Sequence, residues 1–209
     1  MTWERIQDRL ALMSSKEDDA IRQDMLAGFM KSKYPGTDIP LEPPEVAALA
    51  SSVISAGSDT TAIALSAFFY YILTNDAVYY RVQREVDTAY DAGTLKDGEP
   101  VRYAQGVKLE YLQACVKESM RLITPFVMDM LRVVPREGLM VGKWFLPAGT
   151  EVGTNPYVFH RNKRAFGEDA SVFRPERWIG LSAEERPTLE RNFMSVSDLY
   201  ILSWLFVLA

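Results

Sequence analysis

The spacing of apolar residues predicts a helical first half for this sequence. Residues 1–33 are rich in Leu, Met, Lys and Glu, and we expect them to form amphipathic helix. Turn residues follow from Lys33 to Pro40. Residues 45–73 are apolar nearly all round and predict one long helix, begun by Pro43-Pro44. A helix of that length and character is usually buried in the centre of a larger fold.

Two further helices are predicted by apolar residues that recur every third or fourth position. The first follows Thr74-Asn75-Asp76, which end the long helix and can cap the next one; its apolar positions are Val78, Val82, Val86 and Ala89. The second covers residues 109–123, and Thr124-Pro125 stops it. We expect its core side to carry Leu109, Leu112, Val116 and Met120.

The pattern then changes to short strands joined by turns. Strands are predicted over residues 131–134, 139–141 and 144–146, and Gly142-Lys143 is suited to a tight hairpin turn. Residues 147–150 form another turn before Glu151-Val152, and residues 155–191 are irregular with short helical pieces. The predicted fold class is therefore mainly α with a small β region.

Composition narrows the classes of function. Of 209 residues, 48% are hydrophobic and 24% charged, which is typical of a globular protein. The net charge of −5 and the lack of a basic stripe argue against nucleic acid as a partner. One cysteine, Cys115, and one histidine, His160, cannot supply a structural zinc site. Without a signal peptide or a clean spanning segment, the chain is expected to be soluble.

The first candidate site is Ala56-Gly57-Ser58-Asp59-Thr60-Thr61, inside the long helix. Glycine, aspartate and threonine are poor helix formers, so together they indicate a local distortion. Thr60 can bond back to the carbonyl of Ala56, or face a cavity where a neighbouring carboxylate and a hydroxyl relay protons. A polar, solvated face of an ordinary helix explains the same residues equally well.

Two other motifs are weak when taken singly. Glu118 and Arg121 are three residues apart, so they share a helix face and can pair, as many surface residues do. Phe173-Arg174-Pro175-Glu176-Arg177-Trp178 would by itself be an ordinary surface turn.

Taken together in this order, the three motifs resemble the oxygen-activating helix, the K helix and the meander-side motif of cytochromes P450, the haem-thiolate monooxygenases. Residues 146–150 (Leu-Pro-Ala-Gly-Thr) and 159–162 (Phe-His-Arg-Asn) also resemble that family. The similarity covers roughly residues 24–194. It implies the C-terminal half of a P450-like fold, with residues 1–194 as a partial P450 domain and residues 195–209 as an apolar tail outside the family pattern.

The resemblance also implies roles for individual residues. Asp59 and Thr60 would deliver protons for cleavage of the O–O bond, and Ala56 and Gly57 would let the helix approach the haem. Arg132 would bind a haem propionate. Residues 124–130 would border the substrate pocket, and His160 would be structural. A buried charged triad is implied for Glu118, Arg121 and Arg177.

The implied cofactor is haem b, and the implied partners are O2, a small apolar organic substrate and an NADPH-dependent reductase. A full-length eukaryotic homologue would attach to the endoplasmic reticulum membrane through an N-terminal anchor; the motifs resemble fungal members of secondary metabolism. The family's cysteine loop has no match after Met194. Cys115 lies in a predicted helix before Glu118, so we reject it as the ligand. The chain is expected to bind haem poorly and to be inactive, or to be a haem-free remnant or interaction module.

Overall fold

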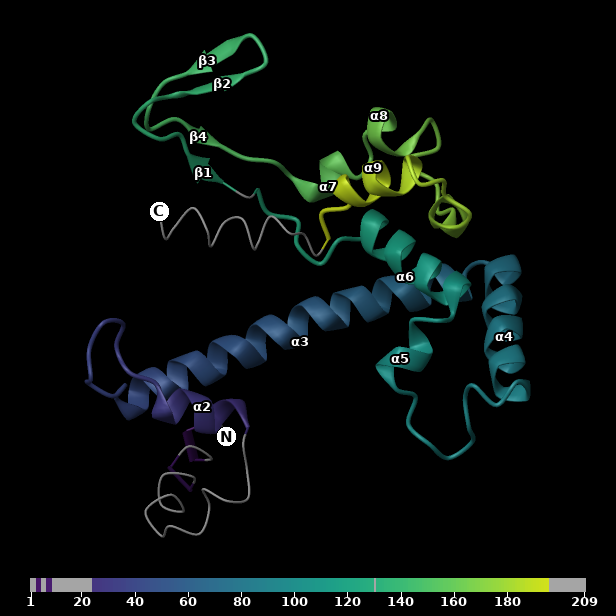
Figure 1. Ribbon diagram of the computed structural model, residues 1–209, viewed down its shortest axis with the longest axis horizontal. Helices are drawn as coiled ribbons and strands as arrows, with labels where there is room; N and C mark the ends of the chain where they lie inside the picture. Colours follow the sequence, from purple (N-terminus) through teal and green to yellow (C-terminus); the bar gives the residue numbers. More distant parts are fainter. Residues whose placement is uncertain (1–2, 5–6, 9–23, 130, 196–209) are drawn as a thin grey trace. The chain divides into compact units, whose positions relative to one another are not determined.

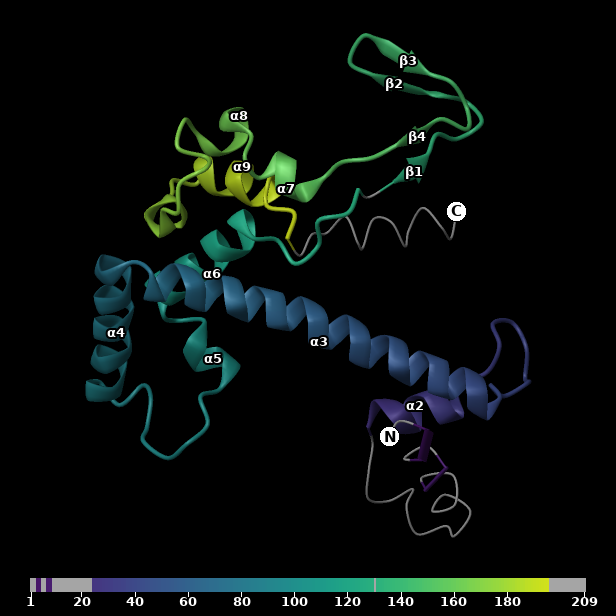
Figure 2. The same cartoon turned by 180° about the vertical axis from the view of Figure 1, so that it is seen from behind.

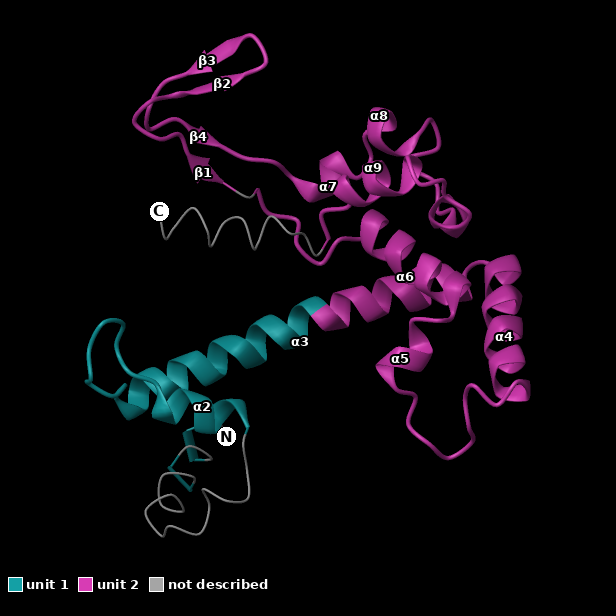
Figure 3. Cartoon of the chain, in the orientation of Figure 1, with its two compact units in different colours: residues 1–60 teal, residues 61–209 magenta. Residues whose placement is uncertain are grey.

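The computed structural model describes residues 3–4, 7–8, 24–129 and 131–195. The chain divides into two compact units, residues 1–60 and residues 61–209, and the boundary falls inside one long helix (Figure 3). Each unit is described by itself below. Most of the helix predicted over residues 1–33 lies outside the described residues, as does the apolar tail after residue 195.

The first unit contains a short helix, a turn and the start of the long helix. Helix α2 covers Met25–Lys31 and is capped by Asp24, whose carboxylate accepts a hydrogen bond from the backbone N–H of Ala27 at 2.9 Å. A β-bridge between Lys33 and Pro40 closes the turn that follows. The turn residues predicted there are confirmed.

Helix α3 covers Pro43–Leu73 (Figure 1), as the apolar run predicted. The predicted distortion at residues 56–61 is wrong, because α-helical structure continues through them without interruption. The threonine hydroxyl bonds inside the helix groove: Thr60 Oγ1 donates to the Ala56 carbonyl at 2.7 Å. The α-helix therefore continues through the helix-hostile residues.

The predicted burial of α3 is also wrong for this chain. Val46, Ala67 and Ile72 are buried, whereas Ile54 is 57% exposed and Phe69 is 53% exposed. A helix that is apolar all round needs neighbours on every side, and the described residues cover only a narrow stripe of this one. By length and composition α3 could also cross a membrane, but a core helix of a soluble protein meets the same test.

Three helices follow in the second unit: α4 (Asp76–Asp91), α5 (Tyr103–Gly106) and α6 (Glu110–Leu122). The predicted helices at 76–90 and 109–123 are confirmed, and α4 packs against α6 (Figure 2). The predicted core side of α6 needs correction. Leu109 is buried, but Leu112, Val116 and Met120 are only half-buried. The fully buried side carries charged residues, because they pair there: Glu118 and Arg121, beside Ala114, Cys115 and Ser119.

The predicted β region is confirmed as two antiparallel pairs. Strand β2 (Leu139–Val141) pairs with β3 (Trp144–Leu146), with Val141 opposite Trp144 across the two-residue turn Gly142-Lys143. Gly142 has φ +60°, which such hairpin turns require. Strand β1 (Arg132–Val133) pairs with β4 (Glu151–Val152). The β2–β3 hairpin lies between these two strands in the sequence and forms a separate pair (Figure 1).

Short helical pieces make up the rest of the described chain, as predicted. They are α7 (Pro156–Phe159), α8 (Lys163–Phe166), the 3-10 helix η1 (Pro175–Trp178) and α9 (Glu185–Arg191). Asn155 and Asn162 cap α7 and α8 with their side chains. Helix η1 packs against α6, which places the Pro-Glu-Arg-Trp segment beside the buried charges of that helix.

The core of the second unit lies on both sides of α6. One apolar cluster joins α3, α4 and α6 through Ile72, Val78, Tyr111 and Cys115. A second cluster joins α6 to the C-terminal pieces through Ala114, Phe166, Ala170 and Trp178. The charged residues of α6 are therefore enclosed by apolar packing, which removes them from water.

Candidate functional site

An ion pair within α6 is completely enclosed. Glu118 and Arg121 each have 0% exposed side chain. Their spacing of three residues places them on one helix face, and the guanidinium binds the carboxylate through two parallel hydrogen bonds. Arg121 Nε donates to Glu118 Oε2 at 2.9 Å, and Arg121 Nη2 donates to Glu118 Oε1 at 2.8 Å.

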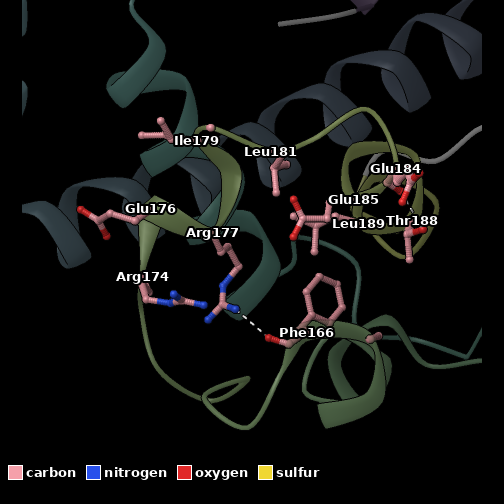
Figure 4. Close-up of a pocket in the computed structure, with 12 residues that line it drawn as sticks. Phe166, Arg174, Glu176, Arg177, Ile179, Leu181, Glu184, Glu185, Thr188 and Leu189 are labelled. Carbon is pink, nitrogen blue, oxygen red and sulfur yellow. Dashed lines mark hydrogen bonds between the residues drawn. The ribbon is translucent and has the colours of Figure 1, made fainter.

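Arg177 reaches the same carboxylate from η1. Its Nε donates to Glu118 Oε1 at 2.9 Å, and its side chain is only 3% exposed. Pro175 begins the 3-10 turn, where its fixed φ is favourable, and this turn directs Arg177 inward. Arg177 Nη1 also donates to the Phe166 carbonyl at 2.7 Å (Figure 4). The structure thus brings together the three residues of the sequence-predicted triad.

Two further donors to Glu118 were missed at the sequence level. Trp178 Nε1 donates to Oε2 at 2.9 Å, and the backbone N–H of Arg174 donates to Oε1 at 2.9 Å. The signal for Trp178 was its position directly after Arg177 on a one-turn helix. For the Arg174 backbone no sequence signal exists, since any residue carries the same N–H.

The electrostatics of Glu118 favour its charged form. Burial alone would raise the pKa of this carboxyl, but the hydrogen bonds and positive charges of Arg121 and Arg177 outweigh burial and hold the pKa below its ordinary value. Glu118 receives five hydrogen bonds, so its two oxygens are well satisfied. A carboxylate held in this way does not exchange protons readily, and the arrangement is structural.

Arg121 extends the network to the loop between α7 and η1. Its Nη1 donates to the carbonyl of His160 at 2.6 Å and to that of Ala170 at 2.5 Å, and Nη2 donates to that of Val172 at 3.2 Å. One guanidinium therefore satisfies three carbonyls that have left regular secondary structure, and those of His160 and Ala170 are buried. The cluster of Glu118, Arg121, Arg177 and Trp178, called the charge cluster below, fastens this loop to α6.

The candidate proton-relay residues lie in the first unit. Ala56, Gly57, Asp59 and Thr60 are all exposed on α3, and Thr60 uses its hydroxyl for the bond to Ala56 described above. Arg132 is exposed in β1 of the second unit, where Nη1 donates to the Leu131 carbonyl at 2.7 Å. These residues keep their predicted roles as proposals only.

Two cavities among the described residues bear on the question of a substrate site. One of about 540 Å³ lies between α8, η1 and α9, and its wall includes Arg174, Glu176, Glu184 and Glu185 (Figure 4). Another of about 380 Å³ is lined by Asp129, and no other described residue of the predicted substrate-pocket segment 124–130 lines it. The first cavity has a mostly polar wall, which does not favour an apolar substrate.

Comparison with known proteins gives the class. The sequence profile of cytochrome P450 matches residues 2–193, so the chain belongs to the cytochrome P450 family. A cytochrome P450 crystal structure has the same fold, with a TM-score of 0.69 over 89% of this chain and 40% of that one, at 22% identity. The predicted family and the mainly helical P450-like fold are thus confirmed.

Curated fungal relatives are more similar in sequence. The cytochrome P450 monooxygenase cicH of Emericella nidulans is 40% identical over 91% of this chain and 37% of its own length. A pisatin demethylase of Fusarium vanettenii is 40% identical over 83% of this chain and 33% of its own length. The monooxygenase easK of Aspergillus fumigatus is 39% identical over 82% of this chain and 50% of its own length. This chain thus spans a third to a half of these relatives.

The residues present do not fit a haem iron held by a thiolate. Cys115 is the only cysteine of the sequence, and it is fully buried in α6. Burial, together with the nearby carboxylates of Glu176 and Glu85, raises the pKa of its thiol to about 12, which keeps the sulfur protonated. Its neighbours in the core are apolar or aromatic, such as Ile72 and Tyr111. Within the described ranges no group of three His, Cys, Asp or Glu side chains could hold a metal ion.

Proposed function

We propose that this chain is a segment of an oxidoreductase that uses O2 to oxidise a small apolar molecule, with electrons from an NADPH-dependent reductase. Membership of the cytochrome P450 family and the monooxygenase names of the fungal relatives support the reaction class. The observation that carries the proposal is the enclosed charge cluster, because the Glu-x-x-Arg and Pro-Glu-Arg motifs meet in it around one carboxylate. Fungal secondary metabolism is the proposed setting.

In the complete protein the segment would contribute two groups of residues. Asp59 and Thr60 would supply protons, with Ala56 and Gly57 giving a small-residue surface beside the haem b. Arg132 would donate its charged fork to a propionate, a use that suits a guanidinium. We place the complete protein at the endoplasmic reticulum membrane, attached by an N-terminal anchor.

For the 209 residues alone, the proposal is a haem-free, inactive polypeptide. The thiolate is the group through which this family pushes electron density onto iron, and the one thiol here is protonated and enclosed. What remains is a helical scaffold whose exposed apolar residues on α3 and the β2–β3 hairpin could serve as interaction surface.

A haem titration tests this proposal. The purified chain is mixed with hemin, reduced, and exposed to carbon monoxide, and its absorbance is compared with that of the Cys115→Ser variant. We expect no thiolate-type Soret band from either protein. A thiolate-type band from the wild-type chain that Cys115→Ser abolishes would refute the proposal, since Cys115 would then be an iron ligand.

A further inference from the structure

His160 is completely buried, yet both of its ring nitrogens have backbone partners. Nδ1 lies 3.0 Å from the carbonyl oxygen of Arg121 in α6. Nε2 lies 2.8 Å from the backbone nitrogen of Met194, three residues after the end of α9. The imidazole therefore bridges two segments that are 73 residues apart in the sequence, with no solvent exposure.

The two partners determine which nitrogen carries the proton. The backbone N–H of Met194 can only donate, so Nε2 must offer its lone pair. The carbonyl of Arg121 can only accept, so the proton must be on Nδ1. Only the neutral Nδ1–H tautomer satisfies both contacts, because a doubly protonated ring would place a second N–H against the N–H of Met194.

The surroundings also hold the ring neutral. Burial, together with the charges of Arg121 and Arg161, lowers the pKa of His160 to about 4, although the Arg121 carbonyl and the carboxylate of Glu118 act in the opposite direction. The remaining packed neighbours, Phe166 and Phe193, are aromatic and uncharged: Phe193 stacks on the imidazole and Phe166 meets it edge-on.

His160 and Arg121 hold each other reciprocally. The guanidinium of Arg121 donates to the carbonyl of His160 at 2.6 Å, and the ring of His160 donates back to the carbonyl of Arg121. Through Arg121 the charge cluster fixes the position of His160, and the ring of His160 in turn holds the backbone of Met194 in place. A second attachment lies one residue later, where Ser195 Oγ donates to the Met120 carbonyl at 2.8 Å.

We propose that His160 is a positioning residue that fixes the path of the chain after α9, at residues 193–195, and that protonation of its ring releases this segment. The inference rests on the proposed function for its consequence: in a full-length P450 this segment would lead toward the cysteine loop that the family resemblance implies after Met194. Its geometry is independent of haem, which separates a failure of this inference from a failure of the proposed function.

Hydrogen exchange of the Met194 amide, followed by NMR on the haem-free chain, tests the inference. Two variants divide the functions of the ring. In His160→Gln the side-chain oxygen can still accept from Met194 but does not titrate, whereas in His160→Asn the shorter amide can donate to Arg121 but does not reach Met194. At neutral pH we expect His160→Gln to keep the protection factor of the Met194 amide, and His160→Asn to lower it about tenfold, the usual range for one lost hydrogen bond.

Reference amides separate local release from general unfolding. The N–H of Ile123, which bonds to the Ser119 carbonyl at 2.8 Å in the last turn of α6, should keep its protection in both variants. On acidification through pH 4, the wild-type Met194 amide should lose protection before Ile123 does, and the His160→Gln amide should not. Ring nitrogen shifts of a protonated Nε2 at neutral pH, or equal protection of Met194 in His160→Asn and wild type, would overturn the inference.

Discussion

The carboxylate of Glu118 provides the sharpest test of what holds the second unit together. Replacing it by glutamine in Glu118→Gln keeps the shape of the side chain but removes its negative charge. Arg121 and Arg177, with side chains 0% and 3% exposed, then remain as buried cations that face an amide. Removing one partner from a buried ion pair costs about 3–5 kcal/mol. We expect the free energy of unfolding to fall by that amount.

Glu176→Gln is a matched control, because it is the same substitution at a carboxylate that also pairs with arginine. Glu176 Oε1 lies 2.7 Å from Arg81 Nη1 and accepts from the Tyr111 hydroxyl at 3.2 Å, but the Glu176 side chain is 46% exposed. Solvent-exposed ion pairs contribute about 0–1 kcal/mol. The control should therefore cost far less than Glu118→Gln, although the lengths of the hydrogen bonds are similar.

Urea denaturation followed by far-UV circular dichroism measures both variants. The pKa of Glu118 is lowered in the folded chain from an ordinary value of 4.5, so its stabilising effect is fully present above pH 4.5 and is lost as the pH falls through the lowered pKa. The difference between wild type and Glu118→Gln should therefore shrink in acid. Equal costs for the two variants at pH 7 would refute the reasoning, since burial would then have no influence on the pair.

Three further predictions follow from the same region. Trp178→Phe, which removes the N–H that donates to Glu118, should cost about 1.5–3 kcal/mol by urea denaturation, whereas Trp144→Phe on the exposed hairpin should stay within about 0.5 kcal/mol. The Cys115 thiol should react with an alkylating reagent only after denaturation, because it is buried and protonated; fast labelling of the native chain would contradict this. The pKa of His160 is 6.5 in the unfolded chain and about 4 in the folded one, so acid favours the unfolded state. As the pH falls from 6.5 to 4, the free energy of unfolding of the wild type should drop by about 3 kcal/mol relative to that of His160→Gln. Parallel curves of unfolding free energy against pH would contradict this.

Local patterns in the sequence predicted the elements well. The apolar runs gave α3, α4 and α6, and Gly142-Lys143 gave the hairpin, because each signal depends on neighbouring residues. Glu118 and Arg121 were predicted to share a face for the same reason. The spacing of apolar residues could not reveal that position 138 requires glycine. The φ of Gly138 is +75°, and a Cβ there would collide with the ring of Phe145.

Contacts between distant segments were beyond the reach of the sequence pattern. The five donors to Glu118 come from α6, from η1 and from the residue before η1, and two of them were not anticipated. The buried face of α6 was misjudged because a charged residue counts as polar in any periodicity, although a paired charge can be buried. The exposure of α3 was misjudged for the opposite reason, since apolar residues predict burial only where a partner surface exists.

The charge balance of the cluster explains why it can lie inside an apolar core. Glu118 carries one negative charge between the two positive charges of Arg121 and Arg177. At the partly exposed edge, Asp169 lies 3.3 Å from Arg177 and 2.6 Å from Arg174. Glu118 lies between both buried guanidinium groups, Asp169 adds a second negative charge beside Arg177, and other N–H groups of the two arginines donate to backbone carbonyls. Such a group can hold a loop in place but has no proton to give near neutral pH. Any proton transfer by this segment would have to come from another site, and the role of Asp59 and Thr60 on α3 in supplying protons is our proposal.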